Sequence, residues 1–214
     1  MNVTNLYIIR HGQSQGNQYD LFLGHTDLDL SEKGHMQAEI TAKYLEDIHA
    51  DAIYSSDLLR AYNTAKHTAD KKGMEIIKSE NLREVFAGDW ENKSFDYLVD
   101  TYKEEYGLWL HDLGNAQCTN GEKVTDLQKR ITDEIRKIAE ENIGKTVFIF
   151  SHATPIRVMQ AYAENKTKDE IKDVPWATNA SVTHIKYQNG EFIPVAYSID
   201  KHMGELTTAL PDNA

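Results

Sequence analysis

The segment that decides the fold is residues 6–17, LYIIRHGQSQGN, in which an apolar run stops abruptly at Arg10 and His11. Its first four residues are apolar on both faces, which is typical of a strand in a parallel sheet that helices cover on each side. A second apolar run, residues 146–150 (TVFIF), leads in the same way to His152. The sequence therefore predicts two buried strands that each end beside a histidine.

Short apolar runs and longer helical patterns alternate along the rest of the chain. This alternation is typical of an α/β fold in which helices cover both faces of a mostly parallel sheet. Asn189 and Gly190 form a hairpin turn signal, which adds antiparallel strands at one edge. We therefore expect a three-layer α/β/α architecture with an edge hairpin. The predicted strands are residues 6–9, 52–55, 74–77, 146–150, 181–187 and 192–198.

Capping residues predict where the helices begin and end. Ser31, Ser56 and Thr154 are expected N-caps, because their hydroxyl groups can accept hydrogen bonds from the unpaired N–H groups of a first turn. Gly73 and Gly144 are expected to end two helices, because glycine readily adopts the left-handed conformation. The helix over residues 122–142 has its apolar stripe at Val124, Leu127, Ile131, Ile135 and Ile138. The helix after Ser31 has its apolar positions at Met36, Ile40, Tyr44, Leu45 and Ile48.

Composition and charge limit the class of protein. The 214 residues are 40% hydrophobic and 27% charged, and they fit one domain over residues 1–214. The net charge of −11 argues against nucleic acid as a main partner, since such proteins usually carry a basic surface. No apolar stretch reaches the roughly 20 residues that span a bilayer. The first residues lack a signal-peptide pattern, and Cys118 has no second cysteine to pair with. We therefore expect a cytoplasmic protein with no membrane partner.

Residues 90–121 interrupt the regular alternation and are rich in aromatic side chains. The spacing of their apolar positions predicts short helices. We interpret this region as a cap-like excursion from the core, placed to cover a site. An equally good interpretation is that each aromatic side chain only packs the excursion onto the body. The aromatic residues are Phe95, Tyr97, Tyr102, Tyr106 and Trp109.

Five polar side chains are expected to meet at one edge of the sheet. Ligands of open α/β sheets bind at the carboxyl ends of the strands, where Arg10, His11 and His152 lie. Arg60 lies in the first turn of the helix after the second strand, and Glu84 follows the third strand. Helix N-termini at the same edge favour an anion. The sequence thus predicts a small cationic crevice in an acidic protein.

These residue types are suited to phosphate-ester chemistry. Guanidinium groups match phosphate oxygens and stay charged. A neutral imidazole is a nucleophile that can form a covalent intermediate with phosphorus. A second, protonated imidazole can donate to the transferred group, and a carboxylic acid with a raised pKa can protonate the leaving oxygen.

Other interpretations of single residues are simpler. A lone histidine at a strand end is more often structural, and a lone helical arginine is most often solvated. Only the joint placement of these side chains favours a site. Clustered histidines also suggest zinc, but two neighbouring arginines repel a divalent cation. The chain also lacks the H-E-x-x-H and C-x-x-C spacings. We therefore expect no metal.

The same residues carry a family resemblance. RHGQSQGN (10–17) resembles the R-H-G-E/Q-S/T signature of the histidine phosphatase superfamily, the phosphoglycerate mutase-like enzymes. Five further blocks resemble that family in the same order, so the resemblance spans nearly the whole chain. These blocks are GHTDLDLSEKGHMQA (24–38), YSSDLLRAYNTA (54–65), LREVFAGDWE (82–91), SHATPIR (151–157) and NASVT (179–183).

The resemblance implies a phosphoglycerate mutase-like fold and a role for each matching residue. His11 would be the nucleophile that carries the phosphoryl group, and Glu84 would give a proton to the leaving group. Water would then release inorganic phosphate, without a metal or a dissociable cofactor. The implied catalytic residues are His11, Glu84, His152, Arg10 and Arg60. The implied phosphate-binding residues are Arg10, Asn17, Gly24, Arg60, His152 and Ala153.

One block indicates a phosphatase more than a mutase. EVFAGDWENKS (84–94) resembles the E-x-x-F-G-x-W-E-G of the smaller phosphatases, such as broad-specificity acid phosphatases and α-ribazole phosphatases. It lacks the Arg and Tyr of the block E-R-H-Y-G-x-L-Q-G-L-N-K found in cofactor-dependent mutases. We therefore predict a phosphatase that acts on a small phosphorylated metabolite.

Three departures and three alternatives accompany this prediction. Gln13 stands where the family commonly has Glu, Ala153 where it usually has Gly, and Asn92 where Gly often follows Trp-Glu; none removes a reacting group.

A phosphoglycerate mutase would share the same pocket. A regulatory protein could bind a phosphorylated ligand without turnover. A phosphoprotein phosphatase could use residues 90–121 to shape a peptide groove.

Overall fold

A six-stranded sheet organises the chain. Its strands are β1 (Thr4–Arg10), β3 (Ala52–Ser55), β4 (Ile76–Lys78), β6 (Thr146–Ser151), β7 (Val182–Gln188) and β8 (Glu191–Ile199). Their spatial order is β4-β3-β6-β1-β7-β8, and the pairings among β4, β3, β6 and β1 are parallel.

The structure is a computed structural model that describes residues 2–208. Residue 1 and residues 209–214 of the expected domain lie outside the described residues.

Strand β1 carries Arg10 and His11 to the carboxyl edge of the sheet. It pairs in parallel with β6, and Arg10 lies opposite Ser151. His11 and His152 therefore leave adjacent strands at the same level. β7 runs antiparallel to both β1 and β8, and the turn between β7 and β8 has positive φ angles at Asn189 and Gly190. The predicted mostly parallel sheet with an antiparallel edge hairpin is confirmed.

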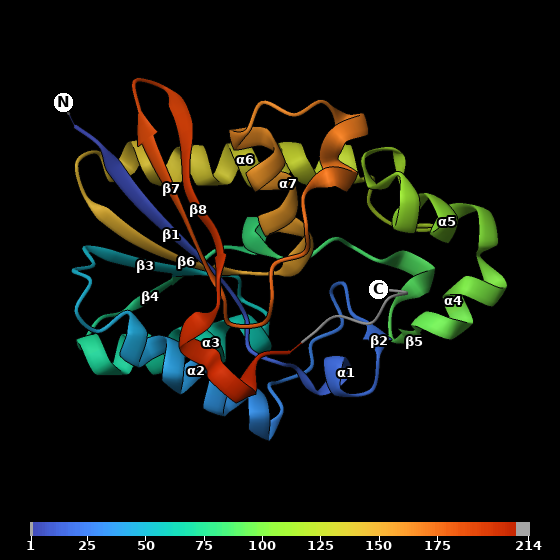
Figure 1. Cartoon of the computed structure of the whole chain (residues 1–214), viewed down its shortest axis with the longest axis horizontal. Coiled ribbons are helices and arrows are strands. Elements are labelled where there is room, and N and C mark those ends of the chain that lie inside the picture. The colour runs from blue at the N-terminus through green and yellow to red at the C-terminus, as the bar shows by residue number, and fades with distance from the viewer. Residues whose placement is uncertain (1, 209–214) are drawn as a thin grey trace.

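Helices cover both faces of the sheet, as Figure 1 shows. The α-helices are α1 (Gln15–Gln18), α2 (Glu32–Tyr44), α3 (Leu59–Lys72), α4 (Phe95–Thr101), α5 (Lys103–His111), α6 (Val124–Glu141) and α7 (Ala153–Ala163). Helices α2 and α3 lie on one face, and α6 and α7 lie on the other. The apolar stripe predicted for α6 is buried along its whole length. Within residues 2–208, no helix has the length and apolar character needed to cross a membrane.

Some predicted helix ends are confirmed, and others are wrong. Ser31 caps α2, and Gly73 ends α3 in the left-handed conformation with φ 62°. Helix α3 begins only at Leu59 and has no side-chain cap, so Ser56 is not its N-cap. Helix α7 begins at Ala153, one residue before the predicted cap Thr154. Both failures occur where the strand ends lead into the site.

The apolar face predicted for α2 is only partly correct: Leu45 lies in the core and Ile48 packs against it, but other positions fail. Met36 and Tyr44 are exposed, whereas the buried face of α2 consists of smaller or polar residues. Small side chains let this helix lie close to the backbone that follows β1. The buried residues within α2 are Gly34, Gln37, Ala38, Thr41 and Ala42.

A smaller layer extends from one end of the sheet. Strands β2 (Leu21–Phe22) and β5 (Lys93–Ser94) pair antiparallel, and helices α4 and α5 follow β5 (Figure 1). The short helices predicted within residues 90–121 are therefore present. The 3-10 helices within the described residues are η1 (Glu80–Leu82), η2 (Gly88–Trp90), η3 (Leu113–Asn115), η4 (Lys168–Asp173) and η5 (Lys201–Leu206).

The segment after His11 packs backbone against backbone on the first turn of α2. A Cβ atom on Gly34 would lie 2.0 Å from the carbonyl oxygen of Gln13. A Cβ atom on Gly12 would lie 2.4 Å from the carbonyl oxygen of Gly34. Only glycines allow this approach, which holds the segment after β1 in place.

We expect Gly34→Ala to lower the free energy of unfolding by about 1–3 kcal/mol, because the backbone at Gln13 must move away. Gly107 provides the matched control. It lies inside α5, where an added Cβ atom would meet nothing of the described chain within 4 Å, so Gly107→Ala should stabilise the protein by about 0.5–1 kcal/mol. Urea denaturation measures both changes. A Gly34→Ala protein as stable as the wild type would contradict the close approach.

Candidate active site

A pocket opens at the carboxyl ends of β1 and β6. Its empty volume is about 560 Å³, including space that is open to solvent. One part of its lining is polar and cationic, and the rest is apolar and aromatic. The lining residues are Arg10, His11, Ser14, Asn17, Leu21, Phe22, Leu23, Arg60, Glu84, Phe95, Trp109, Ala153, Thr154 and Trp176.

His11 lies on the polar side of this pocket and is 4% exposed. Its Nδ1 lies 2.6 Å from the carbonyl oxygen of Gly12, which accepts a hydrogen bond if Nδ1 carries the proton. That tautomer leaves the lone pair of Nε2 available. Burial, together with the charges of Arg60 and Arg10, holds the pKa of His11 well below its usual value. The imidazole is therefore neutral near pH 7.

The backbone around His11 is held by buried polar groups. The N–H of Gly12 donates to the hydroxyl of Thr64 at 3.0 Å. The side-chain amide of Asn179 donates to the carbonyl oxygen of His11 at 3.1 Å. These contacts come from α3 and from the segment before β7, so two distant parts of the chain hold the backbone that carries the imidazole.

His152 lies beside His11, but it is not among the residues that line the pocket. The ring centres are 5.2 Å apart with an angle of 61° between the planes. The ring of His152 is fully buried, and its Nε2 is 2.9 Å from the hydroxyl oxygen of Ser56. Its Nδ1 has no hydrogen-bond partner within the described residues. Burial and the nearby charge of Arg60 hold the pKa of His152 well below its usual value.

Arg10 and Arg60 supply the positive charge. Their guanidinium groups donate to backbone carbonyl oxygens: Arg10 to Ala177, and Arg60 to Thr26 and Gly24. Burial lowers the pKa of each to about 10, so both stay charged near neutral pH. Carbonyl partners orient a guanidinium without neutralising it. The pocket therefore keeps a net positive charge that suits an anion.

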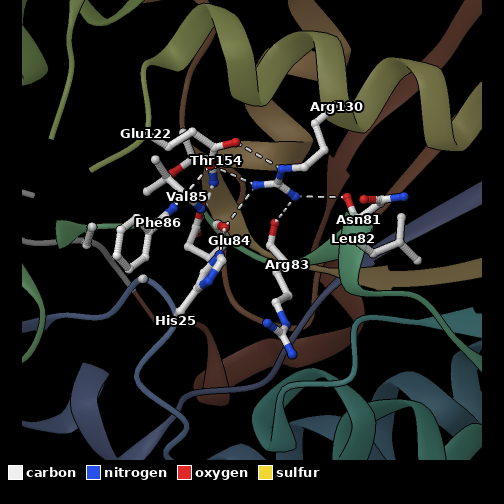
Figure 2. Close-up of polar contacts among 12 residues, drawn as sticks. His25, Asn81, Leu82, Arg83, Glu84, Val85, Phe86, Glu122, Arg130 and Thr154 are labelled. Atoms are coloured by element: carbon white, nitrogen blue, oxygen red, sulfur yellow. Dashed lines mark hydrogen bonds and ion pairs between the residues drawn. The ribbon is translucent and has the colours of Figure 1, made fainter. Parts of the chain in front are cut away.

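Glu84 provides the acidic group of the pocket. Its two carboxyl oxygens accept hydrogen bonds from the backbone N–H groups of Val85, at 2.8 Å, and Thr154, at 3.2 Å (Figure 2). Burial raises the pKa of Glu84, although these N–H groups and the charge of Arg60 oppose the shift. A carboxyl group in this state can hold a proton at higher pH than usual and release it to a bound ligand.

The remaining predicted phosphate-binding residues occupy different positions. Asn17 and Ala153 line the pocket. The side-chain oxygen of Asn17 accepts from the N–H of Ser14, which leaves its amide N–H₂ as the donor. Gly24 lies outside the lining, where its N–H donates to Glu91 and its carbonyl oxygen accepts from Arg60. Gly24 thus contacts the site through the arginine.

The three departures from the family pattern have simple structural accounts. Ala153 is the first residue of α7 and has no positive φ, so this position needs no glycine. Asn92 has a φ of 59°, which is the left-handed conformation that glycine and asparagine both adopt. The side-chain oxygen of Gln13 accepts from the hydroxyl of Ser31, the cap of α2.

The aromatic residues of 90–121 divide between the two interpretations. Phe95 and Trp109 line the pocket, as a covering region requires. Trp90 and Tyr106 are fully buried in the core beneath them. The ring of Trp109 stacks with that of Trp176 at 6.1 Å between centres, so a segment near β7 completes the apolar wall.

The sequence analysis missed several supporting residues. Ser56 and Thr64 each give a hydroxyl to a site residue, and Asn179 gives an amide. They lie inside the quoted blocks, but their spacing does not show which backbone or ring nitrogen they contact. Trp176 lies outside those blocks, and no local pattern marks it.

Glu91 is the most connected of the missed residues. Its carboxylate accepts from the N–H groups of Gly24, His25, Thr26 and Ala87 and from the hydroxyl of Thr26. Burial disfavours its charge, but these hydrogen bonds outweigh burial and lower its pKa. Glu91 thereby holds the segment whose carbonyl oxygens orient Arg60.

We expect Glu91→Gln to lower the free energy of unfolding by about 1–3 kcal/mol, because its amide N–H₂ would face N–H donors. Hydrogen exchange should quicken at the amides of residues 24–26. Glu141, exposed at the end of α6, is the control, and Glu141→Gln should change neither quantity. Unchanged exchange at residues 24–26 in Glu91→Gln would contradict this role.

Comparison with known proteins bears on the family of this chain. The chain matches the histidine phosphatase superfamily (branch 1) over residues 6–200. It is 29% identical to phosphoserine phosphatase 1 of Hydrogenobacter thermophilus over 205 residues, covering 95% of this chain and 96% of the relative. It is 33% identical over 187 residues to a 2,3-bisphosphoglycerate-dependent phosphoglycerate mutase of Bartonella tribocorum, covering 84% and 90%.

A solved structure extends the similarity to the fold. Bacillus stearothermophilus YhfR superposes with a TM-score of 0.89 at 28% identity, covering 94% of this chain and 99% of that one. The family match spans the segments that carry His152 and four residues of the pocket lining, Arg10, His11, Arg60 and Glu84. The chain therefore belongs to the histidine phosphatase superfamily.

Proposed function

We propose that the protein is a metal-independent phosphomonoester hydrolase that acts on a small phosphorylated metabolite through a phosphohistidine. One observation carries this proposal. A neutral imidazole, two charged guanidinium groups and a carboxyl group with a raised pKa border one pocket. Relatives include a protein named as a phosphatase, which supports the same reaction class.

The first half-reaction uses His11 and Glu84. The lone pair of His11 Nε2 attacks phosphorus, and the bond between phosphorus and the ester oxygen breaks. The protonated carboxyl of Glu84 gives its proton to that leaving oxygen. Arg10 and Arg60 neutralise the charge on the other phosphoryl oxygens, as positioned cations do in phosphoryl transfer.

The second half-reaction restores the protein. The carboxylate of Glu84 now takes a proton from water, the water oxygen bonds to phosphorus, and the phosphorus–nitrogen bond breaks. Inorganic phosphate leaves, and the neutral imidazole and protonated Glu84 are regained. His152, the amide of Asn17 and the N–H of Ala153 are proposed to donate to the phosphoryl oxygens.

The apolar wall favours hydrolysis over mutase activity. Beyond the phosphate end, the described pocket lining is Leu21, Phe22, Leu23, Phe95, Trp109 and Trp176. A phosphoglycerate carries a carboxylate as well as a phosphate, and this wall offers no cation to bind it. We therefore propose a substrate whose alcohol part is largely uncharged.

The predicted cytoplasmic location and single-domain organisation remain predictions from the sequence.

The mutase is the second candidate, because one similar relative is named as a mutase. A screen of phosphorylated metabolites, with and without a chelator, separates the two. We expect phosphate release from several monoesters, unaffected by the chelator. Interconversion of 3-phosphoglycerate and 2-phosphoglycerate with little phosphate release would contradict the hydrolase, and loss of activity with chelator would contradict metal independence.

His11→Ala should abolish hydrolysis of p-nitrophenyl phosphate, because no other group replaces the nucleophile. Rapid acid-free quenching of the wild type with radiolabelled substrate should trap one base-stable, acid-labile phosphoryl group, and the variant should trap none. A fully active His11→Ala protein would reject the mechanism. A wild type that binds substrate without any turnover would support the regulatory alternative instead.

The rate should depend on pH in a specific direction. The pKa of Glu84 is raised, so its proton is lost, and kcat/KM falls, as pH rises through that value. The pKa of His11 is lowered, so the imidazole stays neutral until the pH falls well below the usual pKa of a histidine. Glu84→Gln should reduce the maximum rate by about 10²–10⁴-fold and remove the alkaline limb. A limb caused by ionisation of the substrate would persist in the variant and contradict this assignment.

A further inference from the structure

Arg130 on α6 approaches the segment that carries Glu84 from outside the pocket (Figure 2). Its Nη1 donates to the carbonyl oxygens of Asn81, at 2.9 Å, and Arg83, at 3.1 Å. Its Nη2 donates to the carbonyl oxygen of Glu84 at 3.1 Å. One side chain therefore binds the backbone at Glu84 and at two of the three residues before it.

Glu122 completes this arrangement. Its carboxylate accepts from Nε of Arg130 at 2.9 Å and from Nη2 at 2.8 Å. The five N–H groups of a guanidinium are thus matched by five hydrogen bonds of Arg130. Because Glu122 binds Arg130 through two hydrogen bonds and every N–H group of the guanidinium has a partner, the pair is held in one geometry, unlike a flexible surface ion pair.

The same carboxylate also reaches the chain beyond Glu84. One oxygen of Glu122 accepts from the N–H of Phe86 at 3.1 Å, and the N–H of Glu122 donates to the carbonyl oxygen of Phe86 at 2.8 Å. Arg130 holds residues up to Glu84, and Glu122 holds the residue two positions later. The backbone is fixed on both sides of the proposed acid.

Neither member of the pair belongs to the pocket lining of the described residues. Their side chains are 22% and 17% exposed, so solvent screens the pair only partly. The carbonyl oxygen of Glu84 has a second contact, Nε2 of His25 at 3.0 Å, which approaches from the loop held by Glu91. The backbone of Glu84 is therefore fixed, and the N–H groups of Val85 and Thr154 hold its two carboxyl oxygens. Together these contacts restrict where the carboxyl group can lie.

We propose that the Arg130–Glu122 pair is a positioning device for the proton donor of the reaction. It touches neither substrate nor phosphoryl group, and it acts by holding the Glu84 carboxyl group where the leaving oxygen lies. This inference rests on the proposed function, because it requires Glu84 to be the acid. It adds two positioning residues that lie outside the pocket.

The proposal has a signature that loss of folding does not share. In the step that breaks the ester bond, only a leaving group that needs a proton depends on the position of Glu84. Phenyl phosphate and p-nitrophenyl phosphate have nearly the same shape, but p-nitrophenolate leaves readily without a proton and phenolate does not. The quantity to compare is kcat/KM, which reports the steps up to cleavage of the ester bond. The ratio of the two values within one variant cancels the fraction of folded enzyme.

We expect Arg130→Gln to lower kcat/KM for phenyl phosphate at least 10-fold and for p-nitrophenyl phosphate less than 3-fold. Arg130→Lys keeps the charge but loses the planar set of guanidinium N–H donors. Its loss of kcat/KM for phenyl phosphate should therefore lie between that of the wild type and that of Arg130→Gln. Arg136 is the matched control on the same helix, because its guanidinium donates to Gly190 and Tyr162, away from the Glu84 segment. Arg136→Gln should leave the substrate ratio unchanged.

A second measurement separates positioning from a general structural role. In the Glu84→Gln background, Arg130→Gln should cause no further selective loss with phenyl phosphate, since the acid is already absent. If Arg130→Gln does not fold, Arg130→Lys and Glu122→Gln carry the same comparison. Equal losses of kcat/KM with both substrates would overturn the positioning role but leave the proposed function standing. The same holds if the effects of Glu84→Gln and Arg130→Gln on phenyl phosphate simply add in the double variant. A wild type that hydrolyses neither ester would overturn the proposed function as well.

Discussion

The parallel pairing of β1 with β6 is the constraint on which the rest of the site depends. Its register sets Arg10 opposite Ser151, so His11 and His152 leave adjacent strands with their ring centres 5.2 Å apart. A shift of one residue would turn successive side chains to the opposite face and separate the two rings. The apolar runs that specify this pairing therefore also specify the distance between the imidazoles.

The electrostatics of the pocket follow from which partners the arginines have. Arg10 and Arg60 are buried, yet their partners are carbonyl oxygens and not carboxylates. Burial and this uncompensated charge lower the pKa of both histidines, while burial raises that of Glu84. The environment thus keeps the His11 imidazole unprotonated and favours the protonated form of the Glu84 carboxyl group before a ligand binds.

Features set by local sequence were predictable, and features set by distant contacts were not. The strands and the stripe of α6 follow from periodicity, and the glycine that ends α3 follows from its conformational freedom. Ser56 resembles a helix cap in sequence, but its hydroxyl contacts His152 across the sheet. The roles of Glu91 and Arg130 depend on loops that only the folded chain brings to them. Exposed Met36 shows the same limit, since tight backbone packing overrides an apolar pattern.

The pocket lies at the carboxyl ends of β1 and β6, which leaves the opposite edge of the sheet outside it. There the β7–β8 turn at Asn189 and Gly190 lies beside Asn2 near the start of the chain (Figure 1). None of the described residues around this turn belongs to the pocket lining. This edge is accordingly the place to attach a fluorophore, an affinity handle or a solid support, because the attachment would leave the entrance of the pocket open.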